Sequence, residues 1–161
     1  MIQNKNKGFT LIELLVVIAI IGLLASIVLV SLNSARQKAR TSRAIGDLRN
    51  LQTALEMYYD SVGSYPSSGG NWDGLYSCWG DSTSNWITGL VPAYLPQLPR
   101  EPRGITDCDK QYIYYSNGTD YKLIYHNPEN CSGVKTQYPS VIDPIRDCWA
   151  YGNWSSGGRN F

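Results

Sequence analysis

Few residues of this chain could do chemistry, and they fall into a small number of kinds. Glu13 is an acidic residue inside an apolar segment, and His126 is the only histidine. Carboxylates that could offer oxygen ligands to a cation stand at Asp107, Asp109 and Asp120. A lone histidine in a predicted strand is far more often an ordinary sheet residue than a base or a ligand. This set does not resemble a catalytic arrangement, so we predict that the chain is not an enzyme.

The four cysteines could form disulfides. They all lie in the aromatic, polar part of the chain, and none has the short paired spacing of a zinc site or a redox motif. An even number of cysteines in a small domain that follows a membrane segment favours two bridges in an oxidising compartment. Three connectivities are open, and nearest-neighbour pairing gives the one that we take: Cys78 with Cys108, and Cys131 with Cys148.

An apolar segment begins abruptly after a short basic leader at residues 1–8. Between residues 14 and 30 the only polar side chain is Ser26. These residues span roughly 25 Å as a helix, and the apolar residues beside them extend the segment to a hydrocarbon core of about 30 Å. We therefore predict a membrane-spanning helix at residues 9–32.

Glu13 is the unusual residue of this segment. A carboxylate inside a membrane costs roughly 2.5–3.5 kcal/mol unless it finds a partner, which makes it a functional candidate. Near a helix start, it could also reach the interface and interact with the positive end of the helix dipole. The residues alone leave both interpretations open.

The small residue Gly8 stands before the apolar run. An ordinary secretory signal carries its small-residue cleavage site after the run. Composition leaves a cut near Ser34 or Ala35 open, but charged residues follow there at once.

The N-terminal sequence resembles a known family. Lys7-Gly8-Phe9-Thr10-Leu11-Ile12-Glu13, followed by the aliphatic run, is similar to the class III signal of type IV pilins and of the pseudopilins of type II secretion. Residues 58–66 and 90–99 resemble segments that follow the long helix in this family, notably in the major pseudopilin. The resemblance is strong for residues 7–66, extends to about residue 102 and fades afterward.

This resemblance implies a processing and assembly route. A prepilin peptidase is expected to cleave between Gly8 and Phe9, usually with N-methylation of the new Phe9 amine. In a helical filament of many copies, Glu13 is expected to neutralise the Phe9 amine of a neighbouring subunit. The other implied partners are an inner-membrane assembly platform and, before assembly, membrane lipid. The implied location is the cytoplasmic (inner) membrane, single-pass with the domain outside, and then an extracytoplasmic or cell-surface filament.

Helical periodicity continues past the apolar run. Apolar residues recur every three or four positions at Ile45, Leu48, Leu51, Leu55 and Tyr58. This pattern predicts an amphipathic helix at residues 33–60 whose apolar stripe covers a sheet.

The remaining residues, 61–161, are predicted to form the sheet. Segments 111–116 and 120–126 are rich in tyrosine and isoleucine and flank an Asn-Gly pair, which is a strong hairpin signal. A third strand is expected around residues 146–151. We therefore predict an α+β pilin fold, in which the long helix packs on three or four antiparallel strands stapled by disulfides.

Charge and composition limit the partners. The formal net charge is +1, so no basic excess points to nucleic acid. No cofactor is predicted, although some major pseudopilins hold calcium and the three aspartates Asp107, Asp109 and Asp120 are weak candidates for it. A minor pilin that acts as a binding module, in DNA uptake or adhesion, is the alternative function. A simple single-span anchor is a third interpretation, which would make Gly8 and Glu13 coincidences.

Overall fold

The computed structural model describes residues 8–76, 78 and 84–161, so most of the predicted leader lies outside the described residues. The chain divides into two compact units, Met1–Lys38 and Ala39–Phe161. Helix α1, Leu11–Val62, contributes residues to both units.

The described part of the first unit is the apolar part of α1. Every large apolar side chain from Phe9 to Leu32 is exposed, from 41% at Leu32 to 90% at Phe9. Ser26, the only polar side chain between residues 14 and 30, is satisfied locally, since its hydroxyl donates to the carbonyl of Leu23 at 2.7 Å. This helix is long and apolar enough to cross a membrane.

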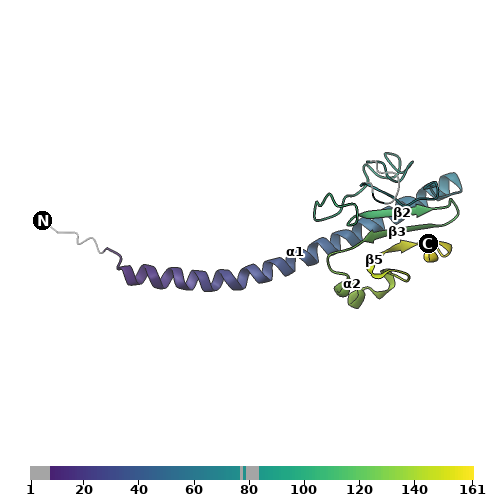
Figure 1. Ribbon diagram of the computed structural model, residues 1–161. Coiled ribbons are helices and arrows are strands. Elements are labelled where there is room, and N and C mark those ends of the chain that lie inside the picture. The colour runs from purple at the N-terminus through teal and green to yellow at the C-terminus, as the bar shows by residue number, and fades with distance from the viewer. Residues whose placement is uncertain (1–7, 77, 79–83) are drawn as a thin grey trace. The chain divides into compact units, whose positions relative to one another are not determined.

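The second unit is an antiparallel sheet with the rest of α1 on one face (Figure 1). The strand order is β1-β2-β3-β5-β4. The strands are β1 (Asp73–Gly74), β2 (Tyr112–Ser116), β3 (Tyr121–His126), β4 (Ile142–Asp143) and β5 (Asp147–Trp154). Between β3 and β4 lie a short helix, α2 (Cys131–Gln137), and a 3-10 turn, η1 (Pro139–Val141); a second 3-10 turn, η2 (Gly157–Asn160), follows β5.

The first face of the sheet packs on the predicted apolar stripe of α1. Leu48, Leu51 and Leu55 are each at most 3% exposed, which confirms the stripe. Tyrosines supply most of the sheet's side of this core, at positions 112, 114, 121, 125 and 151. Four of these hydroxyls, those of Tyr112, Tyr114, Tyr121 and Tyr125, donate to polar partners, as when Tyr112 donates to Asp47 at 3.0 Å. The core therefore gains the large apolar area of tyrosine and still satisfies its polar atom.

The second face of the sheet is buried as well, which the sequence analysis did not predict. All six residues of β3 are buried. Ile113, Ile124 and Ala150 form a small cluster there with Trp72 packed against it. The ring of Phe161 meets that of Tyr115 at 4.8 Å between centroids, so the segment after β5 contributes to the cover.

Several elements differ from the prediction. The sheet has five strands instead of three or four. The strands β1 and β4 were not predicted because each is two residues long and shows no alternating pattern. Helix α2 was missed too, since seven residues are too few to show helical periodicity. Helix α1 ends at Val62, where Gly63 adopts a φ of 81° and its amide donates to the carbonyl of Tyr59 at 2.7 Å.

Glu101 holds the segment before β2 against the sheet. Its side chain is buried and accepts hydrogen bonds from the Tyr125 hydroxyl at 2.5 Å, from the Arg103 guanidinium and from the Ile105 amide at 3.2 Å. Burial raises the pKa of Glu101, but the bonds from Tyr125 and Arg103 outweigh it, so that the pKa lies below the ordinary value of 4.5.

We expect Glu101 to make the domain sensitive to acid. Because its pKa is lower in the folded than in the unfolded state, the ionised carboxylate stabilises the fold above pH 4.5, and this contribution is lost as the pH falls below that value. The measurement is the melting temperature of the wild type and Glu101→Gln from pH 7 to pH 3. The difference between the two should shrink towards acid pH, and a difference that is constant with pH would contradict the assignment.

Candidate functional site

The candidate site is the start of α1, where Thr10 and Glu13 hydrogen-bond to each other. The Glu13 carboxylate accepts from the Thr10 amide at 2.8 Å and from the Thr10 hydroxyl at 2.7 Å. The Glu13 amide lies 3.3 Å from the Thr10 hydroxyl oxygen, to which it donates. This is a capping box, in which residues at the N-cap and N3 positions satisfy each other's amides. The carboxylate that would be costly in a membrane therefore has a partner within its own chain.

The predicted cleavage point lies just outside the helix. Gly8, Phe9 and Thr10 have no regular secondary structure and are exposed, and α1 begins at Leu11. The Gly8–Phe9 bond is therefore accessible without unwinding the helix. Lys5 and Lys7 of the leader lie outside the described residues.

Thr10 is the residue of this site to which the sequence analysis assigned no role. Its signal was present, because threonine followed three residues later by glutamate is the sequence pattern of a capping box. The capping box agrees with the interpretation in which Glu13 interacts with the start of the helix, and the role of Glu13 in assembly stays a prediction.

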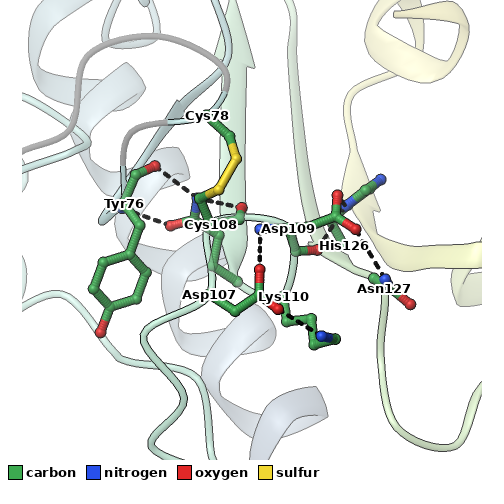
Figure 2. Close-up of a disulfide and its surroundings, with 9 residues drawn as sticks. Tyr76, Cys78, Asp107, Cys108, Asp109, Lys110, His126 and Asn127 are labelled. Carbon is green, nitrogen blue, oxygen red and sulfur yellow. Dashed lines mark hydrogen bonds and ion pairs between the residues drawn. A yellow bond between two sulfur atoms is a disulfide. The ribbon is translucent and has the colours of Figure 1, made fainter.

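The first predicted disulfide is present. Cys78 and Cys108 are bonded, and the bridge joins the loop after β1 to the segment before β2 (Figure 2). The Gln111 side chain ties the same segments, since it accepts from the Tyr76 amide at 2.8 Å and donates to the carbonyls of Tyr76 at 2.9 Å and Cys108 at 2.7 Å. The bridge ties Cys78, and the glutamine ties Tyr76, to the segment before β2.

The other two cysteines are neighbours in space, and both are free thiols in this structure. Cys131 is the first residue of α2 and is buried, and Cys148 lies on β5. Burial and a hydrogen bond with the Cys148 thiol raise the pKa of Cys131 to about 12. The fold has therefore brought the second predicted pair together, and their bond remains a prediction.

The three aspartates considered for calcium do not form one site. Asp107 accepts from the Asp109 amide at 2.9 Å and from the Lys110 ammonium at 2.5 Å. The Asp109 carboxylate accepts from the Asn127 side-chain amide at 3.0 Å, and its other oxygen lies 3.2 Å from His126 Nδ1. Figure 2 shows these neighbours. Asp120 is at the other end of β3, roughly 20 Å away by the length of the strand. Each carboxylate is engaged by protein groups of its own surroundings.

Asp120 illustrates this engagement. It accepts from the Ser155 hydroxyl at 2.6 Å and from the Gly157 amide at 3.0 Å, and so fastens the segment after β5 to the start of β3. Among the described residues, no group of three or more histidine, cysteine, aspartate or glutamate side chains is arranged to hold a metal ion.

Comparison with known proteins places the chain in a class and then in a family. Residues 3–29 match the prokaryotic N-terminal methylation motif, which covers the predicted cleavage point and most of the apolar run and defines a pilin-like protein. Residues 31–141, more than half of the chain, match type II secretion system (T2SS) protein G. The chain belongs to this family, whose members are the major pseudopilins.

Individual relatives agree with the family. The chain is 36% identical to the type II secretion system core protein G of Pectobacterium carotovorum over 94% of this chain and 86% of the relative. It is 37% identical to that of Dickeya chrysanthemi, over 96% and 90% of the two chains. The protein of the same name from Klebsiella pneumoniae is 28% identical over 98% of this chain and its own full length. No solved structure matches the chain.

We predict that Cys131 and Cys148 form a second bridge under oxidising conditions. Their thiols would pass two electrons to an oxidant such as oxidised glutathione and release two protons, so that the chain with both bridges is about 4 Da lighter than the fully reduced chain. A non-reducing peptide map should show a Cys131–Cys148 peptide. Cys131→Ser should lose only that peptide and keep the Cys78–Cys108 one, whereas full alkylation of both thiols in the oxidised, folded protein would contradict the pairing.

Proposed function

We propose that this chain is a structural subunit of a pseudopilus. It is held in the inner membrane by residues 9–32 before assembly, with the domain outside, and held in the filament by the same residues afterwards. Membership of the protein G family and the methylation motif support this proposal. They also favour a structural role over an enzymatic one.

The exposed apolar side chains supply the driving force. Burial of one valine, leucine, isoleucine or phenylalanine side chain contributes about 1.5–3 kcal/mol, and the chain carries a long run of them between Phe9 and Leu32. These side chains are therefore not stable in contact with water. Lipid covers them before assembly, and the helices of neighbouring subunits do so afterwards.

Processing prepares the first residue for this assembly. Hydrolysis of the Gly8–Phe9 bond by a prepilin peptidase removes the basic leader and leaves Phe9 with a new amine, which the enzyme then methylates. The exposed, non-helical backbone at residues 8–10 suits this cleavage. The charged amine enters the filament core and there requires a partner of opposite charge.

Glu13 provides that partner, and the observation that carries this proposal is its hydrogen bonding to Thr10. In the isolated subunit, the carboxylate is satisfied by groups of its own chain, which lowers its cost in lipid. In the filament, the Phe9 amine of a neighbour replaces them, and the ion pair forms where water is absent. Glu13 thus has one partner before assembly and another after it.

The alternative functions have less support. A minor pilin that binds DNA or a surface would require a family other than the one the chain matches along residues 31–141. A simple membrane anchor leaves the methylation motif without a purpose. The assembly platform of the secretion machinery and other pseudopilins are the partners that the proposal requires.

Replacement of Glu13 by alanine should block assembly and spare membrane insertion. Removing the carboxylate leaves the Phe9 amine unpaired in an apolar core, which costs several kcal/mol, so we expect the assembled fraction to fall by at least about tenfold. The measurement is the amount of subunit in sheared, sedimentable filaments relative to the amount in the membrane.

Ser26→Ala is the matched control, because Ser26 is the only polar residue between positions 14 and 30 and its hydroxyl bonds only to its own helix. It should assemble like the wild type. Wild-type filament yield from Glu13→Ala, with normal insertion and cleavage, would refute the role of Glu13.

A further inference from the structure

The ammonium of Lys122 is enclosed on the second face of the sheet. Lys122 lies on the central strand β3, and its side chain is completely buried. The ammonium donates to an Asp143 carboxylate oxygen and to the main-chain oxygens of Arg159 and Phe161, each at 3.0 Å. An ammonium has three donors, and here all three are used. It also lies 5.5 Å from the centre of the Trp154 ring.

Asp143 is held in place by groups other than Lys122. It is fully buried on β4, and it accepts from the amides of Ile145 at 2.8 Å and Arg146 at 3.2 Å. Its second oxygen accepts from the Arg146 guanidinium at 3.0 Å, and the same guanidinium nitrogen donates to the Phe161 oxygen at 3.1 Å. The carboxylate is therefore oriented independently of the lysine.

The main-chain oxygens of Arg159 and Phe161 are brought to the Lys122 ammonium by the close approach of the segment after β5. Gly158 packs so tightly on β3 that a side-chain carbon there would be 1.9 Å from the Tyr121 carbonyl oxygen. The Gly157 amide bonds to Asp120, and the Ser155 amide bonds to the Tyr121 carbonyl at 3.1 Å. Three oxygens from two separate segments thus converge on one point over the sheet.

We propose that Lys122 acts as a built-in cation. One Asp143 carboxylate oxygen and two main-chain oxygens are the kind of ligand set that binds a hard cation, and the lysine supplies that cation from within the chain. It fastens η2 and the residues around it to the second face of the sheet. When the lysine is shortened to alanine, the vacated space becomes a binding site for a small monovalent cation that can donate hydrogen bonds, such as an alkylammonium.

The geometry selects this class of cation over a divalent metal. The 3.0 Å distances suit N–H···O bonds and exceed the 2.3–2.6 Å of calcium–oxygen contacts. Asp143 also remains paired with Arg146 when the lysine is shortened.

The test is chemical rescue of Lys122→Ala in the full-length chain in detergent. Tryptophan fluorescence reports on the domain alone, because no tryptophan lies within α1. We expect the melting temperature to fall by more than about 10 °C, since breaking a buried ion pair is strongly destabilising. Ethylammonium chloride should recover part of this loss, whereas tetramethylammonium chloride, which has no N–H donor, should not.

Two further variants separate charge from packing. Lys122→Met keeps most of the aliphatic stem without the charge, and it should also melt well below the wild type and gain nothing from ethylammonium. Lys135→Met removes an exposed ammonium that bonds to Asp147 and should change the melting temperature little. Wild-type stability of Lys122→Met, or equal effects of the two salts on Lys122→Ala, would overturn the proposal.

A measurement on the wild type keeps the test decisive if the alanine variant does not fold. Acylation by an N-hydroxysuccinimide ester should label Lys135 rapidly and Lys122 at least about a hundredfold more slowly, because the Lys122 amine has no access to solvent while the domain is folded. Equal labelling rates would show that Lys122 is not held in the site.

Discussion

The apolar side chains of the first unit must be kept out of water, and this constraint governs both the membrane-bound and the assembled state of the subunit. Among the described residues of this unit, every large apolar side chain from Phe9 to Leu32 is exposed. A carboxylate at the start of such a helix needs a partner wherever the helix goes. The capping box with Thr10 is the partner that the subunit carries with it, and the role proposed for Glu13 in assembly is an exchange of this partner for another.

The second unit solves a different problem, namely how a small domain buries both faces of its sheet. One face is covered by the amphipathic part of α1 through a core rich in tyrosine. The other is covered by the segment after β5, which has little apolar surface and is fastened largely by polar interactions, at Asp120 and around Lys122. Each of these polar atoms is satisfied, so the buried charges hold the segment in one position.

The features that could be predicted are those with a local pattern. Gly8, Phe9 and Glu13 combine in a specific motif, and the helical stripe repeats every three or four residues. The main strands are marked by tyrosine and isoleucine on either side of an Asn-Gly pair. The pairing of Cys78 with Cys108 was obtained by proximity in the sequence. Thr10 could have been recognised as part of a capping box from its spacing to Glu13.

The features that could not be predicted depend on contacts between distant segments. Lys122 stands in a strand where its type indicates a solvent-facing residue, and only the return of residues 157–161 over the sheet buries it. The separation of Asp120 from Asp107 and Asp109 likewise follows from the length and direction of β3, not from the sequence positions of the three residues. The edge strands are too short to leave any pattern.

The most direct test of the filament-subunit proposal is the mass of the chain's N-terminal peptide, taken from the native membrane and from sheared filaments. The mature chain should begin at N-methylated Phe9 in both fractions. A chain that begins at Met1 in cells with an active prepilin peptidase, or one cut beyond Val30, would contradict it.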